Sequence, residues 1–252
     1  MAEPENVPQF NPPKTIVREY AEMILVTGVQ VLFLMTFIFQ AMNVPTGSMQ
    51  NTINIGDQFF VNKFVYGKPE SLLSKILPQR EIKRGDVVVF KLPSKPSVNY
   101  IKRCIGLPGD EILVKGTSVF INGQEIPEQK VSIDIDRMHD PDGKIAAQPV
   151  KSEEPAPAGA TYKTYYDINE PEHFSHAMRF AVDRPLKIPA DSYFMMGDSR
   201  DNSEDSRFWG IVPRTHIVGR PLYVYWSFNT QDPSNASSAD AVKFSRFGTA
   251  IK

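Results

Sequence analysis

Residues capable of chemistry occur in three short segments of the sequence. The first segment is Pro45-Thr46-Gly47-Ser48-Met49. Proline fixes its φ angle and glycine permits φ angles that other residues avoid, so we expect a tight turn that presents Ser48 together with its amide. Backbone N–H groups in such a turn can stabilise an oxyanion, and the Thr46 hydroxyl could add a second donor. Taken alone, the segment is equally compatible with an ordinary loop.

The second segment is the strand-like run from Tyr100 to Gly106, which contains Lys102. Side chains alternate along a strand, so Lys102 shares a face with Tyr100 and Cys104, whereas Arg103 belongs to the other face. A lysine in such a run is commonly an edge residue whose amine reaches water. If the amine is buried instead, the loss of hydration lowers its pKa towards neutrality, and the lysine can act as a general base without a histidine.

The third segment is a polar loop, Gly197–Arg207, which is followed by Phe208-Trp209-Gly210. Its many Asp, Asn, Ser and Arg side chains need partners within the fold, which Asx turns and ion pairs can supply. Acidic loops also bind calcium, but the spacing does not match the EF-hand order. A loop with a purely structural role is the alternative.

Taken together, these segments resemble one protein family. In chain order the matching sequences are VPTGSMQNTINIGDQFFVNKFVYG, RGDVVVFKLP, YIKRCIGLPGDEI and MGDSRDNSEDSRFWG, and an apolar N-terminal run precedes them. In order and spacing they are similar to the type I signal peptidases, the membrane-bound leader peptidases of bacteria. The resemblance extends over residues 18–126 and 179–227, which is most of the chain.

The resemblance implies a serine endopeptidase that uses a Ser-Lys dyad. Ser48 would be the nucleophile and Lys102 its general base, in place of a Ser-His-Asp triad. The chemistry would be acyl transfer, in which the lysine accepts the serine proton, protonates the leaving amine and then activates water. The resemblance implies no metal and no cofactor.

The remaining site residues are also implied by the resemblance. The Ser48 amide and the Thr46 hydroxyl would hold the oxyanion; many relatives carry serine where this chain has threonine. Ser203 would orient the lysine amine, and Asp205 would support the site through an ion pair with Arg207. We also expect an ion pair between two further residues, Asp198 and Arg103.

The implied substrates are preproteins with N-terminal signal peptides. Met49, Tyr100 and Ile101 would line shallow pockets for small residues, which gives an Ala-x-Ala-like preference before the cleaved bond. The extended substrate would add as a strand beside the sheet, where main-chain hydrogen bonds give affinity and pockets give specificity.

Composition excludes several other classes of protein. The 252 residues include 28 basic and 29 acidic side chains, so the chain lacks the basic surplus that nucleic-acid binding requires. Cys104 is the only cysteine, and the four histidines lack HExxH-like spacing, so we expect neither a disulfide nor a metal site. The implied mechanism needs only a monomer.

The N-terminal part of the sequence is suited to a membrane. No charged residue occurs among the 34 residues from Met23 to Gly56, and the 20 residues Met23–Met42 are apolar enough to cross a bilayer as a helix. A buried helix and a cleaved signal peptide are the alternatives, but no small-x-small pattern follows the run. We therefore predict a cytoplasmic tail (1–17) and one transmembrane anchor (18–42) in the inner membrane, with the catalytic domain on the outer face.

After the anchor the pattern predicts a mainly β, antiparallel fold. The expected catalytic domain comprises 43–126 and 178–228, interrupted by an acidic, proline-rich, non-catalytic excursion (127–177) and followed by a polar, frayed tail (229–252). Asn122-Gly123 predicts a hairpin turn. The expected strands are Phe59–Tyr66, Asp86–Leu92, Asn99–Leu107, Glu111–Lys115, Met178–Val182, Ser192–Met196 and Ile217–Phe228.

Four aromatic residues are candidates for contact with the lipid surface or, alternatively, for the core: Phe59, Phe60, Phe208 and Trp209. Cys104 is expected to pack in the core. Two other functions compete with the peptidase. A self-cleaving Ser-Lys regulator of the LexA type would need a DNA-binding domain where this chain has its apolar run. An anchored adaptor without activity would have no need of a buried lysine.

Overall fold

The N-terminal part of the chain forms one long apolar helix. The structure is a computed structural model that describes residues 15–44, 46–67, 78–133, 150–168, 178–228 and 242–252. It divides into two compact units, Met1–Ile38 and Phe39–Lys252. In the first unit, α1 (Ile16–Phe33) continues as a π-helical turn, Leu34–Ile38. The 22-residue stretch Ile16–Phe37 is long and apolar enough to cross a membrane. None of the residues in its most apolar 18-residue segment is buried in the protein.

The helix ends earlier than the predicted anchor. Residues 39–42 of that prediction belong to β1 (Phe39–Asn43), which pairs antiparallel with β2 (Asp57–Asn62). The side chains of Phe39 and Met42 are apolar in either setting. Hydrophobicity alone therefore could not locate the change from helix to strand.

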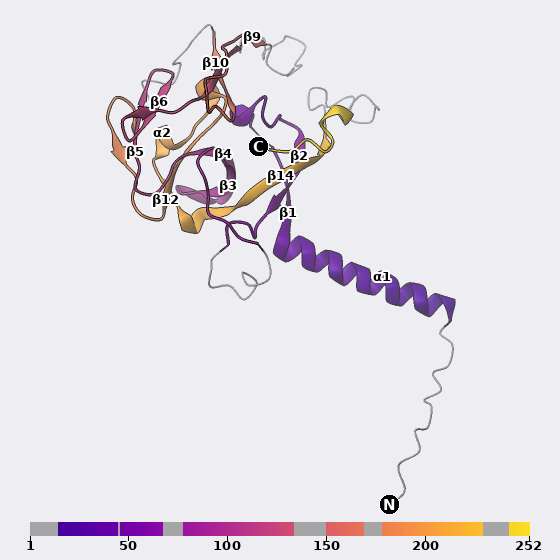
Figure 1. The fold of residues 1–252 in the computed structure, drawn as a ribbon. Helices are drawn as coiled ribbons and strands as arrows, with labels where there is room; N and C mark the ends of the chain where they lie inside the picture. The colour runs from indigo at the N-terminus through magenta and orange to yellow at the C-terminus, as the bar shows by residue number, and fades with distance from the viewer. Residues whose placement is uncertain (1–14, 45, 68–77, 134–149, 169–177, 229–241) are drawn as a thin grey trace, which may run out of the picture. The chain divides into compact units, whose positions relative to one another are not determined.

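The second unit is built around a seven-stranded sheet in the order β1-β2-β14-β3-β4-β12-β13 (Figure 1). Every neighbouring pair in it is antiparallel, which confirms the predicted mainly β, antiparallel class. The remaining strands of this sheet are β3 (Val87–Leu92), β4 (Lys95–Gly106), β12 (Ser192–Met196), β13 (Val212–Pro213) and β14 (Ile217–Ser227).

The middle of the sheet is buried on both faces. All five residues of β12 are buried, and so are the last six of β4. One hydrophobic cluster includes Ile101, and another includes Cys104, which packs in the core as predicted. Because both faces of β4 are covered, consecutive residues of this strand lie in the interior whichever way they point.

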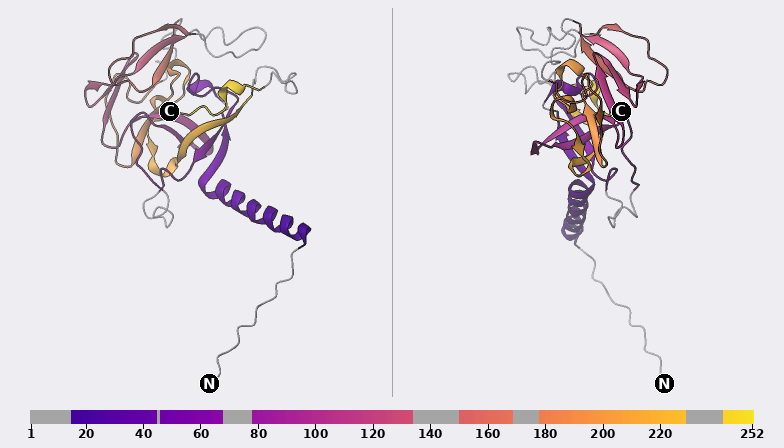
Figure 2. Two further views of the ribbon diagram at one scale, coloured as in Figure 1. Left: turned by 45° about the vertical axis from the view of Figure 1, so that its right-hand side comes forward. Right: turned by 90° about the vertical axis from the view of Figure 1, so that its left-hand side faces the viewer.

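Two smaller sheets complete the unit. Both lie at a distance from β1, as Figures 1 and 2 show. One contains β11 (Leu186–Lys187), β5 (Glu111–Lys115), β6 (Ser118–Ile121) and β7 (Gln124–Glu125). The predicted hairpin turn joins β6 to β7, with positive φ at both Asn122 and Gly123. The other contains β10 (Lys163–Asp167), β8 (Gln129–Ile133) and β9 (Val150–Glu153), in which β10 and β8 run parallel.

Two parts of the chain differ from the prediction. Residues 178–182 form no extended strand, because Ala181 adopts a positive φ of 61°. The end of the chain, predicted to be frayed, pairs with β14 at Ala250, although Phe244 and Phe247 are exposed. Ile251 is only 4% exposed, and its amide donates to the Leu222 carbonyl (2.8 Å). Residues 229–241 of the predicted tail lie outside the described part.

Candidate active site

Ser48 lies at the centre of a single 3₁₀ turn, Gly47–Met49. The turn follows Thr46, whose backbone is extended, and is closed by a hydrogen bond from the Gln50 amide to the Gly47 carbonyl (2.8 Å). Ser48 is buried, and its carbonyl accepts a hydrogen bond from the Ser199 amide (3.1 Å). The predicted tight turn is therefore present, although Pro45 lies outside the described residues.

Lys102 points at this turn from the middle of β4. Its Nζ donates a hydrogen bond to Ser48 Oγ and lies 5.6 Å from the centre of the Tyr100 ring. The lysine is 1% exposed, and no described carboxylate forms an ion pair with it. Burial lowers the pKa of Lys102 to about 8, partly offset by the negative charge of Asp205. A substantial share of the amine is therefore neutral near physiological pH.

The polar loop supplies the neighbours of this pair. Arg207 holds Asp205 through two parallel hydrogen bonds, Nε to Oδ1 (2.9 Å) and Nη2 to Oδ2 (2.8 Å), so the predicted ion pair is present. Burial alone would raise the pKa of Asp205, but Arg207 and hydrogen bonds outweigh it and hold the pKa below its ordinary value. Ser203 donates to Asp205 Oδ2 (2.8 Å), and no hydrogen bond joins it to Lys102 within the described chain.

Gly197 allows the loop to approach the serine turn. A Cβ placed on it would lie 2.2 Å from Ser203 Oγ and 2.6 Å from the Ser48 carbonyl oxygen, so only glycine fits. Its amide donates to Asp205 Oδ2 (3.0 Å). The two halves of the site are thus packed against one another at a residue without a side chain.

On the other face of β4, Arg103 makes the predicted ion pair with Asp198. Its Nε and Nη2 donate to the two carboxylate oxygens at 2.7 and 2.6 Å, and both side chains are almost fully buried. Thr52, just after the serine turn, also donates to Asp198 (2.6 Å). Sequence reasoning did not find Thr52, because a threonine in a turn carries no signal of a distant partner.

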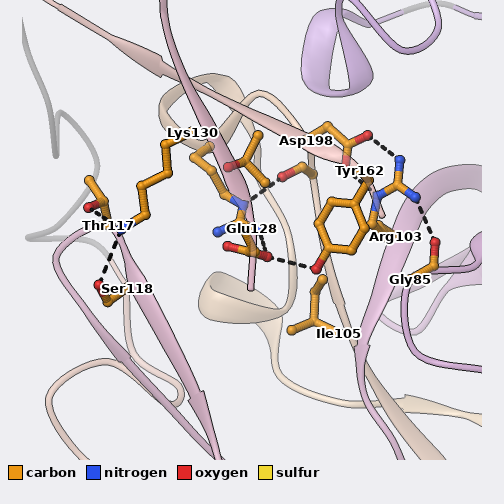
Figure 3. Close-up of polar contacts among 12 residues, drawn as sticks. Gly85, Arg103, Ile105, Thr117, Ser118, Glu128, Lys130, Tyr162 and Asp198 are labelled. Carbon is orange, nitrogen blue, oxygen red and sulfur yellow. Dashed lines mark hydrogen bonds and ion pairs between the residues drawn. The ribbon is translucent and has the colours of Figure 1, made fainter. Parts of the chain in front are cut away.

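A second buried ion pair was also missed. Arg200 and Glu128 are each 2% exposed at the side chain and are joined directly by Nη2 and Oε1. Glu128 also accepts a hydrogen bond from the Tyr162 hydroxyl (2.8 Å), and Figure 3 shows that Tyr162 lies between Glu128 and Arg103. In the sequence, Glu128 follows a proline and gives no hint of this role. Arg200 does suggest an ion pair, because it lies in a loop rich in charged residues.

The other predicted site residues lie near the dyad in different degrees of exposure. Met49 is completely buried and Ile101 is 9% exposed, both in the same hydrophobic cluster. Tyr100 is half-buried. Thr46 is exposed, and its side chain makes no hydrogen bond to the turn that follows.

The candidates for lipid contact are not exposed. Phe59 is 1% exposed and belongs to the core, which is the second of the two alternatives predicted for it. Phe60, Phe208 and Trp209 are half-buried; Phe60 stacks on Tyr225 with ring centres 4.3 Å apart. Aromatic residues in strands are mostly core residues, and residue type alone does not separate the two roles.

Residues 17–226 match the family model described as "Signal peptidase, peptidase S26". The chain belongs to the signal peptidase family, peptidase S26. This membership confirms the resemblance of the motifs and makes the protein a serine endopeptidase of the signal peptidase I type. The match includes both Ser48 and Lys102 and extends from the apolar helix into β14.

Individual relatives in this family are similar over most of the chain. The signal peptidase I of Pseudomonas aeruginosa is 36% identical over 234 residues, 86% of this chain and 74% of the relative. That of Rickettsia typhi is 34% identical over 229 residues, 85% of this chain and 81% of the relative. A solved signal peptidase I from Enterococcus faecalis is 22% identical, with a TM-score of 0.34, and covers 56% of this chain and 97% of its own. The sequence matches carry the family assignment.

Proposed function

We propose that this signal peptidase cleaves preproteins with Ser48 as nucleophile and Lys102 as general base. The observation that carries the proposal is the hydrogen bond between Lys102 Nζ and Ser48 Oγ in a buried site. A lysine whose pKa is about 8 can take a proton near neutral pH, which an ordinary lysine cannot. No histidine is needed.

The chemistry proceeds by acyl transfer. Neutral Lys102 accepts the Ser48 proton as Oγ attacks the carbonyl carbon before the cleaved bond. The ammonium then protonates the leaving amine, and the C–N bond breaks to leave an ester on Ser48. Lys102, neutral again, removes a proton from water, which hydrolyses the ester and restores the serine.

The oxyanion is stabilised at the start of the serine turn. The first N–H groups of a helical turn have no partner within the turn, so the Ser48 amide is suited to donate to the oxyanion. The exposed Thr46 hydroxyl, two residues earlier, is free of the turn's own hydrogen bonds and supplies the second donor. Ser203, whose hydroxyl donates to Asp205, would accept a hydrogen bond from the amine of Lys102 once that amine is protonated and moves away from Ser48, and would then orient it.

Specificity for small residues before the cut follows from the tight packing of the predicted pocket residues. Met49 and Ile101 are buried within one cluster, which leaves little depth for a substrate side chain, and Tyr100, which packs against another cluster, lies beside the Lys102 amine. An Ala-x-Ala sequence fits such shallow pockets. Placing leucine or phenylalanine at either alanine should slow cleavage by at least about tenfold; equal rates would contradict the pocket assignment.

The stretch Ile16–Phe37 serves as an uncleaved membrane anchor. It is long and apolar enough to cross a bilayer, and Ser48 follows its helical end at Ile38 by ten residues. The N-terminus would lie in the cytoplasm and the catalytic unit outside, where signal peptides emerge. Protease added to intact spheroplasts should digest the catalytic unit and spare the N-terminal tail; the reverse result would overturn this orientation.

Purified full-length protein in detergent, mixed with a preprotein, tests the dyad. Ser48→Ala and Lys102→Met should each abolish cleavage, and mass spectrometry should place the parent's cut after the small-x-small sequence. If both variants cleave like the parent, Ser48 and Lys102 are not the catalytic pair.

A further inference from the structure

The excursion, predicted to be non-catalytic, supplies the partners of a buried arginine behind the active site. Arg200 Nη1 donates to the Tyr166 hydroxyl (3.0 Å) and Nη2 to Glu128, and both acceptors come from this segment. Its Nε donates to the Gly197 carbonyl (3.2 Å), in the loop that approaches Ser48. A buried guanidinium needs such partners, because a charge left alone in the interior is costly.

Tyr162 connects this arginine to the second one. Its hydroxyl donates to Glu128 (2.8 Å), and its ring centre lies 4.3 Å from the Arg103 guanidinium carbon, a cation–π contact. Figure 3 shows the ring between Glu128 and Arg103, with Asp198 above the ring and Gly85 on the far side of that arginine. Burial raises the pKa of Tyr162 well above its ordinary value, so the hydroxyl stays a donor.

The backbone of β10 runs along the same loop. The Tyr165 amide donates to the Asp198 carbonyl (2.8 Å), and the Asp167 amide donates to Asp201 Oδ2 (2.8 Å). The excursion therefore contacts the loop through its main chain as well as through side chains. These contacts reach Asp198, Arg200 and Asp201, and none of them involves Ser203 or Asp205.

The same loop residues contact the catalytic groups. The Ser199 amide donates to the Ser48 carbonyl (3.1 Å), and Arg207 Nη2 donates to the Arg200 carbonyl (2.7 Å) while it holds Asp205. A shift of Arg200 would therefore move groups on both sides of the dyad. Misplacement by about 1 Å can lower an enzyme's rate by about 10²-fold.

We propose that Glu128 and Tyr162 are positioning residues, which hold Arg200 and Arg103 so that the loop Gly197–Arg207 keeps Ser48 and Lys102 in register. The proposal rests on the proposed Ser48–Lys102 dyad. Neither residue touches the dyad, and both act through the two arginines. The excursion is thus part of the catalytic unit in function, although it contributes no reacting group.

The test measures kcat and KM separately for full-length variants in detergent, at a temperature well below unfolding. Glu128→Gln keeps the shape of the side chain but removes its charge, and should lower kcat about tenfold to hundredfold with little change in KM. Tyr162→Phe removes one hydrogen bond and should lower kcat about fivefold. Tyr162→Leu, which also removes the ring from Arg103, should lower it further.

A pH profile separates positioning from mere stabilisation. Burial lowers the pKa of Lys102 and the charge of Asp205 raises it, so a displaced loop, which changes both, should move the acidic limb of kcat/KM away from its position in the parent. Lys130→Met is the control: Lys130 lies in the same segment and donates to Thr117 and Ser118 (3.3 Å each), away from the loop (Figure 3). It should leave kcat and the limb unchanged.

Two outcomes are distinguishable. If the Glu128 and Tyr162 variants melt earlier but keep the parent's kcat and acidic limb, they only stabilise the fold and the positioning proposal is wrong. If Ser48→Ala and Lys102→Met, assayed in parallel, remain active, the dyad itself is wrong.

Discussion

Lys102 and Arg103 are neighbours in β4, and the protein shifts their pKa values in opposite directions. They are 1% and 2% exposed, so both are taken out of water to the same degree. Arg103 faces the Asp198 carboxylate, whose attraction outweighs the effect of burial and raises the arginine's pKa. Lys102 faces the Ser48 hydroxyl, and burial lowers its pKa to about 8.

This contrast separates a structural charge from a reactive one. A buried cation with a carboxylate at hydrogen-bond distance stays protonated and fixes the positions of its partners. A buried cation without one gives up its proton easily, which is what general-base catalysis requires. The residue types fit these roles, because guanidinium holds its proton in proteins whereas an ammonium group readily shifts its pKa.

The largest expected effect comes from Lys102→Met, which removes the amine and keeps the side chain's length. We expect cleavage to fall about 10³- to 10⁴-fold, because the general base and the proton for the leaving amine are both lost. Stability should rise, since a buried amine is replaced by an apolar group. Initial rates and urea unfolding of the detergent-solubilised protein measure the two effects.

Lys95→Met is the matched control for this variant, because Lys95 lies on the same strand and is exposed. It should change neither quantity. A Lys102→Met enzyme that retains more than about a tenth of the parent rate would contradict the role of Lys102 as general base.

Arg103→Met should show the opposite pattern in stability. It leaves Asp198 buried without a counter-charge, which costs about 3–5 kcal/mol in the free energy of unfolding. Lys163→Met breaks an exposed pair with Glu153 and should cost no more than about 1 kcal/mol. Equal urea midpoints for the two variants would show that the Arg103 pair is not structural.

The sequence predicted the reactive side of β4 better than the structural side. Ser48, Lys102 and Asp205 lie in short segments whose order along the chain resembles one family, and that resemblance implied that they meet in one site. The Asp198–Arg103 pair was also predicted, as a hypothesis added to the roles that the family resemblance implies.

Glu128 and Tyr162 could not be found in this way. They lie in an acidic, proline-rich stretch that contains no recognisable motif. Their partners Arg200 and Arg103 are 72 and 59 positions away in the sequence. Long-range pairing depends on how the sheets stack, and alternation along a strand gives no information on that. The contact of Ile251 with β14 was missed for the same reason, because the polar residues 231–240 before it suggest a free tail.

Gly197 contacts both the reactive and the structural groups of the loop, so its substitution should affect both. Its amide donates to Asp205 on the reactive side and its carbonyl accepts from Arg200 on the structural side. Gly197→Ala places a methyl group against Ser203 and Ser48, so the loop must retreat, and we expect kcat to fall about 10²-fold.

Gly28→Ala provides the control for this substitution, because a Cβ on Gly28 meets no atom within 4 Å. It should leave the single-turnover rate at the parent value. If Gly197→Ala also keeps that rate, the close contact between the loop and the serine turn is not needed for catalysis.

The smallest effect concerns the pH dependence of the parent enzyme. If neutral Lys102 is the active form, kcat/KM should fall about tenfold per pH unit below a pKa of about 8 and level off above it. The free energy of unfolding should also depend on pH, but in the range above the pKa of about 8. The folded pKa lies below the unfolded value of 10.5, so between about pH 8 and 10.5 the unfolded chain binds more protons and stability rises with pH.

Below pH 8 the lysine is protonated in both states, and the fold carries the full cost of burying the ammonium, on the order of 3 kcal/mol. Lys102→Met should therefore lose the rise in stability between pH 8 and 10.5, whereas Lys95→Met should keep it. Urea titrations at several pH values measure this difference. If the rise in stability persists in Lys102→Met, another group causes it. Lys102 would then stay protonated over this pH range, as Arg103 beside it does.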